Sequence, residues 1–252
     1  MPGNNPAQRM IGLMEKVPHV GPQEPMVHGL KTLFSYEPPD AYRGHAQRLE
    51  QVLVQIDLAE AGLRALQFPE TLFLKEFSRA RSAFTPSALN ANFNHVRDHL
   101  TSDVLLAFKW AAFALPDEGE ALKSERLQEL TDQVAAQLKD NALQALPEGL
   151  RSFLTEHLTA ILNALRGYSV AGVEPLQKAV KDFGVELVAN RDAINTATAS
   201  ADDQAEPILS RTKALIRKVV ETASLAGKGA DGVEKVWKFA AERGPQLIDW
   251  AQ

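Results

Sequence analysis

The chain has 252 residues, a formal net charge of −5 at pH 7 and a hydrophobic content of 45%. This is enough for one large globular domain, or for one domain with an appended module. The negative charge argues against a nucleic-acid partner, because proteins that bind nucleic acid usually carry a basic stripe. The absence of cysteine excludes disulfides, thiolate metal sites and cysteine catalysis.

The beginning of the chain lacks the apolar core of about 7–15 residues that a signal peptide needs. No apolar run elsewhere reaches the roughly 20 residues that span a bilayer. We therefore expect a cytoplasmic protein without a membrane-spanning segment.

Proline is concentrated in the first part of the chain, because residues 1–39 hold seven of the 14 prolines. Prolines at this density favour extended backbone, so we predict an extended arm that lies over the core or over a partner. From Asp40, which can cap a helix, the apolar period becomes helical. Residues 40–194 are therefore predicted to form the main domain.

Apolar residues in this domain recur three or four apart, and no segment shows the alternation of a strand. We expect helices from Asp40 to just before Pro69, over 70–84, over 85–115, from Ser124, from Pro147 to Gly167, and over 171–194. The predicted fold class is all-α, a bundle-like arrangement of about seven to nine helices around a central buried helix.

The segment between Thr85 and Pro116 is predicted to be one long helix. Thr85 can cap it, and Pro116 cannot continue it. A break near Thr101–Asp103 is an alternative, since those side chains can cap a new helix. One apolar stripe runs along the whole segment: Leu89, Phe93, Val96, Leu100, Val104, Ala107, Ala111 and Leu115.

The second half of this segment, Val104–Leu115, is apolar on nearly every side, because Leu105, Leu106, Phe108, Trp110 and Phe113 cover the rest of its circumference. A helix of this kind is buried by protein or by lipid. The run is too short to span a bilayer and contains Lys109. We therefore predict that Val104–Leu115 is the centre of the hydrophobic core.

The last quarter of the chain is predicted to be a separate module. Residues 195–205 are small and polar and indicate a linker. Residues 206–252 then indicate a C-terminal amphipathic helical module, in which the glycine-rich stretch 226–232 forms a hinge.

His95 and His99 have the spacing of metal ligands, since residues four apart share one face of a helix. The zinc-protease helix needs a glutamate directly after the first histidine, and Val96 stands there instead. We therefore predict no metal site and interpret the pair as boundary histidines, with a metal site as the weaker hypothesis.

Two further side chains allow a chemical interpretation. Lys109 could act as a desolvated nucleophile, but lysine readily extends its ammonium group to water. His157 lies on an apolar face and is expected to be a core residue with a hydrogen-bond partner. We find no phosphate-binding, dinucleotide-binding or nucleophile-elbow motif, and predict no cofactor and no catalytic residue.

The C-terminal module is the predicted partner-binding site. Large apolar side chains stand there beside several lysines and follow the glycine hinge. They can bind in the groove of a partner, lie on an anionic membrane surface, or pack back onto the core. The predicted site comprises Trp237, Phe239, Leu247, Ile248 and Trp250.

Three functional hypotheses follow. The leading one is a non-enzymatic helical interaction protein, an adaptor or accessory subunit of a cytosolic bacterial assembly that binds a protein partner or a second copy of itself. The second is a membrane-associating helical effector of a defence or toxin system. The third is a metalloenzyme that uses His95 and His99.

Overall fold

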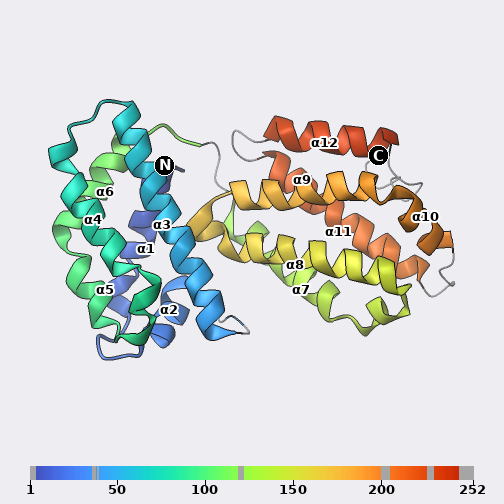
Figure 1. Cartoon of the computed structure of the whole chain (residues 1–252), viewed down its shortest axis with the longest axis horizontal. Coiled ribbons are helices and arrows are strands. Elements are labelled where there is room, and N and C mark those ends of the chain that lie inside the picture. The colour runs from blue at the N-terminus through green and yellow to red at the C-terminus, as the bar shows by residue number, and fades with distance from the viewer. Residues whose placement is uncertain are drawn as a thin grey trace. The chain divides into compact units, whose positions relative to one another are not determined.

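The computed structural model confirms the all-α fold class. Among the residues that it describes, it contains twelve α-helices and four 3₁₀ helices (Figure 1). The β pairing in this part of the chain is a single antiparallel bridge between Pro25 and Asn92. No described helix is long and apolar enough to cross a membrane. The described residues are 4–35, 38, 40–118, 122–199, 205–225 and 230–243.

The chain divides into two compact units. Unit 1 comprises Met1–Glu118 with Ser169–Gly172, and unit 2 comprises Gly119–Tyr168 with Val173–Gln252. The division therefore falls inside the stretch 40–194 that we expected to be one domain. The reason is that the two halves of that stretch contribute to separate hydrophobic clusters, one in each unit.

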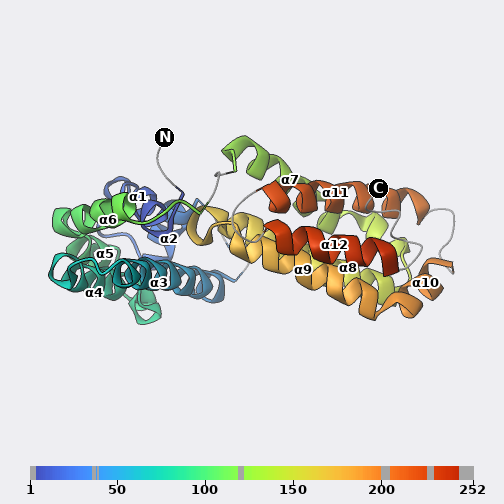
Figure 2. The ribbon, with the colours of Figure 1, turned by 90° about the horizontal axis from the view of Figure 1, so that it is seen from above.

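Unit 1 contains the first six α-helices. Its long helix α3 packs against α1, α2 and α4, while α6 packs against α1 and α4 (Figure 2). The bounds are α1 Pro6–Met14, η1 Val17–His19, α2 Met26–Phe34, α3 Ala41–Ala65, η2 Glu70–Leu72, α4 Leu74–Ala83, η3 Pro86–Asn90, α5 Asn94–His99 and α6 Ser102–Ala114.

The predicted extended arm is wrong, because residues 1–39 contain α1 and α2. Asn5 caps α1 by accepting a hydrogen bond from the backbone N–H of Gln8 at 3.0 Å, and Pro6 occupies the start of the helix. Proline has no N–H, and an N–H at the first helical position would have no partner within the helix. Proline is therefore favoured at this position. Met10 and Leu30 are fully buried, which places both helices in the core of unit 1.

The single helix predicted over 85–115 is also wrong, because the chain is broken into η3, α5 and α6. Around Asn92 the backbone is extended and pairs with another segment. The N–H of Met26 donates to the carbonyl oxygen of Ala91 at 3.0 Å, and the N–H of Phe93 donates to that of Glu24 at 2.8 Å. The alternative break before Ser102 is correct, since Thr101 has the extended backbone of a helix cap.

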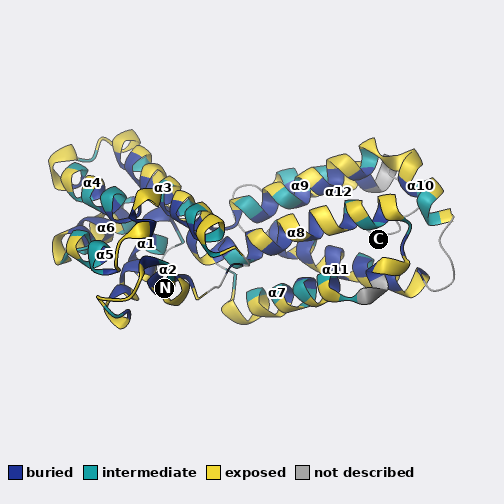
Figure 3. Cartoon of the chain, turned by 60° about the horizontal axis from the view of Figure 1, so that its bottom comes forward, coloured by how far each residue is buried: buried dark blue, intermediate teal, exposed yellow. Residues whose placement is uncertain are grey.

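Unit 2 contains the remaining helices, except that residues 169–171 at the end of α8 belong to unit 1. The buried faces of these helices turn towards one another (Figure 3). Helix α12 packs on α9 and α11, and α11 packs on α7 and α9. The bounds are α7 Ser124–Lys139, η4 Asn141–Ala145, α8 Glu148–Ala171, α9 Glu174–Ala189, α10 Arg191–Ala199, α11 Glu206–Leu225 and α12 Ala230–Arg243.

The predicted linker and module are only partly described. Residues 195–199 of the linker belong to α10, so this part is helical, and 200–204 lie outside the described residues. The amphipathic helices α11 and α12 exist as expected, but their buried residues belong to the core cluster of unit 2. Residues 226–229 of the predicted hinge lie outside the described part.

Candidate functional site

Helix α6 has one buried side and one exposed side. Val104, Phe108 and Ala111 are fully buried. Phe108 stacks on Phe77 of α4, with the ring centroids 4.2 Å apart and the ring planes at 5°. Such a contact adds to the free energy of burial and holds the helix in one orientation. The side of α6 that packs against the other helices of unit 1 is therefore fixed.

The opposite side of α6 carries three large apolar side chains in solvent. Leu106 and Trp110 are each 52% exposed, and Phe113 is 88% exposed. They stand at positions i, i+4 and i+7, so they form one row along the helix. We name this row the α6 stripe. Its exposure corrects the prediction that Val104–Leu115 is buried on every side.

Single exposed apolar residues are common on protein surfaces, whereas an aligned group of them indicates an interaction site. The charged residues of α6 itself are Asp103 and Lys109, which are both exposed. They contribute one negative and one positive charge, so these neighbours give the stripe no net charge. Lys109 is thus a surface residue beside an apolar row, and its environment is unlike that of a desolvated nucleophile.

His95 and His99 lie together, with ring centroids 4.8 Å apart. The Nε2 atom of His95 is 2.9 Å from the carbonyl oxygen of Ser82, which can only accept, so this nitrogen donates. A donating nitrogen is not free to bind a metal. Among the described residues, no group of three or more histidine, aspartate or glutamate side chains could hold a metal ion.

The environment of His99 disfavours its protonated form. Burial lowers the pKa of His99, and electrostatic interactions with His95 and Arg79 lower it further, while Asp98 opposes them. The hydrogen bond of His95 to Ser82, rather than the pKa of His99, favours the interpretation of the two side chains as boundary histidines.

His157 is buried in unit 2, as we predicted. Its ring lies between Phe153 and Phe183, at centroid distances of 4.6 and 4.9 Å. Its Nε2 atom is 3.3 Å from a carboxylate oxygen of Glu186, but without the geometry of a hydrogen bond. The expected hydrogen-bond partner of Nε2 is thus not present among the described residues.

The residues predicted to bind a partner do not form one surface among the described residues. Trp237 is 5% exposed and packs edge-on against Phe183, with the ring centroids 5.8 Å apart. Phe239 is 45% exposed. The other three predicted residues, Leu247, Ile248 and Trp250, lie outside the described residues.

Sequence reasoning missed the α6 stripe, although the signal was present in the sequence. A helix that is apolar all round needs neighbours on every side, and α6 has its main contacts with α1 and α4. No family model, no curated protein and no solved structure matches this chain. The geometry of the described residues is therefore the basis for a functional proposal.

Proposed function

We propose that this chain is a non-enzymatic helical interaction protein, an adaptor or accessory subunit of a cytosolic bacterial assembly, and that the α6 stripe binds its protein partner. The observation that carries the proposal is the row of Leu106, Trp110 and Phe113, with exposed fractions of 52%, 52% and 88%.

The composition of the stripe favours a protein partner. Tryptophan is enriched among the residues that contribute most to binding, and aromatic residues are enriched in interface cores. Burial of apolar surface contributes about 25 cal/mol per Å², so covering three large side chains contributes several kcal/mol. The partner that fits a row at i, i+4 and i+7 has an apolar groove that accepts one face of a helix.

A membrane surface is the competing partner from the second hypothesis. Helices that lie on anionic membranes carry many lysines or arginines on their polar face. The stripe has Lys109 on one flank and Asp103 on the other, which provides no net attraction to anionic lipid. The opposite side of α6 is already buried in unit 1. These observations favour a protein groove.

Photo-crosslinking tests this proposal in native lysate. A benzoylphenylalanine at position 113 lies at the most exposed point of the stripe. The matched control places the same group at Tyr42, an aromatic residue of α3 that is 58% exposed. We expect one protein to crosslink from position 113 and not from position 42. The additional change Trp110→Glu is expected to abolish this crosslink, while Leu66→Glu, at an equally exposed leucine, leaves it unchanged.

Co-sedimentation with anionic vesicles separates the two kinds of partner. We expect less than about a twofold difference between the wild-type chain and Trp110→Glu. Vesicle binding that requires Trp110 would replace the protein partner with a membrane. Equal crosslinking from positions 113 and 42, or crosslinking that survives Trp110→Glu, would refute the proposed site.

A further inference from the structure

We infer that a groove between α7 and α11 of unit 2 binds an acidic amphipathic helix of a partner protein. The groove has a volume of about 640 Å³ and is lined by residues of these two helices and by Asp140, which directly follows α7. It is a second docking surface, and the argument for it is independent of the α6 stripe.

A hydrogen bond between buried side chains connects α7 and α11 at the base of the groove. The Nε2 atom of Gln137 on α7 donates to Oγ1 of Thr212 on α11 at 3.1 Å, and both side chains are buried. The hydroxyl of Thr212 in turn donates to the carbonyl oxygen of Ile208 at 2.9 Å. A satisfied buried network of this kind fixes the spacing of the two helices. The groove is therefore preformed.

The groove has an apolar leucine at its base and small side chains beside it. Leu215 of α11 is buried at the base, while Ala136 and Ala214 are exposed on either side. Alanine at both positions leaves room for an aliphatic side chain from outside. A leucine that enters here would be packed against Leu215 and shielded from water.

The rim of the groove is cationic. It carries Lys139, Arg211 and Lys218 against the carboxylate of Asp140, and the carboxylate of Glu129 lies 3.9 Å from Nζ of Lys218. These five side chains sum to +1, in a chain whose formal net charge is −5. Charge complementarity therefore selects an acidic occupant.

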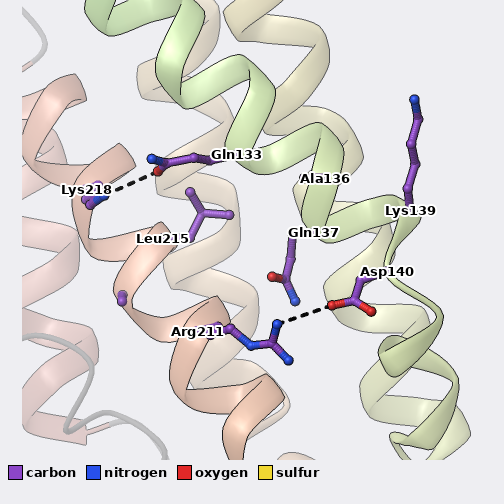
Figure 4. A pocket seen from close by; sticks show the side chains of 9 residues that line it. Gln133, Ala136, Gln137, Lys139, Asp140, Arg211, Leu215 and Lys218 are labelled. Carbon is purple, nitrogen blue, oxygen red and sulfur yellow. Dashed lines mark hydrogen bonds and ion pairs between the residues drawn. The ribbon is translucent and has the colours of Figure 1, made fainter.

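The two cations of α11 are only loosely engaged. Figure 4 shows Arg211 directed towards Asp140 and Lys218 towards Gln133, with Leu215 between them. Arg211 lies 3.5 Å from the carboxylate of Asp140 and donates from Nε to the carbonyl oxygen of Pro207 at 3.4 Å. Nζ of Lys218 lies 3.4 Å from the amide oxygen of Gln133 and 3.9 Å from the carboxylate of Glu129. All four contacts are long, so each contributes little and can be exchanged for a better partner.

The spacing of these groups specifies the pattern of the occupant. Arg211 and Lys218 are seven residues apart, about 10 Å along α11, and Leu215 lies between them. A partner helix that lies along the groove would place acidic residues at its positions i and i+7 beside Arg211 and Lys218. Leucines at its positions i+3 and i+4 would then lie over Ala136 and Ala214. An inorganic anion would pair with the rim but leave Leu215 at the base uncovered.

The test uses a fluorescein-labelled, end-capped helical peptide of about 18 residues with an alanine-rich frame. It carries glutamate at i and i+7 and leucine at i+3 and i+4. Binding to the full chain is measured by fluorescence anisotropy at low ionic strength. We expect the double variant Arg211→Glu/Lys218→Glu to bind about tenfold more weakly than the wild-type chain. The groove-filling variant Ala214→Phe is expected to weaken binding similarly.

The matched control is Arg217→Glu. Arg217 is exposed on the same helix and pairs with Glu221, 3.7 Å away, outside the groove. We expect this variant to bind within about twofold of the wild-type chain. Circular dichroism confirms that each variant is folded before binding is measured.

The inference is overturned if the wild-type chain shows no saturable binding up to about 1 mM peptide. It is also overturned if the double variant binds as well as the wild-type chain. A peptide with alanine in place of both leucines should bind at least about fivefold more weakly. If the alanine peptide binds equally well, or if equimolar inorganic phosphate displaces the leucine peptide, the groove attracts any anion. Either result likewise refutes the docked helix.

Discussion

Helices α6 and α12 both carry a tryptophan beside a lysine, yet the two tryptophans lie in opposite environments. Trp110 of α6 is 52% exposed, whereas Trp237 of α12 is 5% exposed. From the sequence we expected the reverse, with α6 in the core and α12 available to a partner.

The distribution of apolar residues around each helix explains the difference. In α12, Val233, Trp237 and Ala240 fall on one side and are buried, while the exposed pair Glu234 and Lys238 forms an ion pair at 2.6 Å. A single apolar stripe is satisfied by one set of neighbours. In α6 the apolar residues exceed what α1 and α4 can cover. Excess apolar surface, rather than amphipathic pattern, thus predicts the exposed apolar face here.

The largest expected effect follows from replacing the two tryptophans. Trp237→Ala should lower the free energy of unfolding of unit 2 by about 3–5 kcal/mol, because it removes a buried ring that packs on Phe183. Trp110→Ala should change the stability of unit 1 by about 1 kcal/mol or less. Urea denaturation followed by circular dichroism measures both. Equal losses in the two variants would contradict the contrast between α6 and α12.

A smaller effect is expected at the contact between α9 and α12. A Cβ atom at Gly184 would lie 2.8 Å from Cγ1 of Val236, so Gly184→Val should destabilise unit 2 by about 1–3 kcal/mol. The matched control is Gly12→Ala in α1, where a Cβ atom meets nothing within 4 Å.

That control should stabilise unit 1 by about 0.5–1 kcal/mol, since alanine is the better helix former. Thermal unfolding of both variants measures the difference. If Gly184→Val is as stable as the wild-type chain, α12 does not depend on close packing against α9.

Features set by local chemistry could be predicted from the sequence. Asp40 caps α3 by accepting from the N–H of Arg43 at 3.0 Å, as expected for an acidic residue before a helix. Leu115 has extended backbone before Pro116, which ends α6 where the proline requires it. The helical period likewise predicted a helix in the region of α9, whose buried residues include Val180 and Phe183.

Features set by distant contacts could not be predicted in this way. The extended backbone at Asn92 depends on hydrogen bonds to Glu24 and Met26, which are far away in the sequence. The division into two units depends on which helices pack together, and the periodicity of a single helix does not contain that information. Tertiary contacts override local propensity at such positions.

The candidate sites were predictable only in part. The apolar circumference of α6 was visible in the sequence, but which side of it stays exposed depends on the placement of Phe77 and α1. The groove in unit 2 depends on two alanines, Ala136 and Ala214, from helices far apart in the chain. No local motif marks a site that is formed by the absence of large side chains.

The smallest expected effect is a change of stability with pH. It compares His99, which precedes α6 in the chain, with the ion pair between Glu234 and Lys238 of α12. The lowered pKa of His99, caused first by burial and then by His95 and Arg79, means that the folded chain binds its proton less readily than the unfolded chain does. The unfolded form therefore takes up more protons below its pKa of about 6.5, so stability is complete above that pH and falls as the pH decreases through it.

In α12 the ion pair acts in a different pH range. The hydrogen bond from Lys238 lowers the pKa of Glu234, so the stability that this pair provides is present above the unfolded pKa and is lost only in more acidic solution. We expect unfolding between pH 7.5 and 5.5 to show a decline of less than about 1 kcal/mol that His99→Gln removes, because His99 is partly exposed. Glu234→Gln should leave this slope unchanged. A slope that survives His99→Gln would show that another group of the chain causes it, and would remove the proposed role of burial at His99.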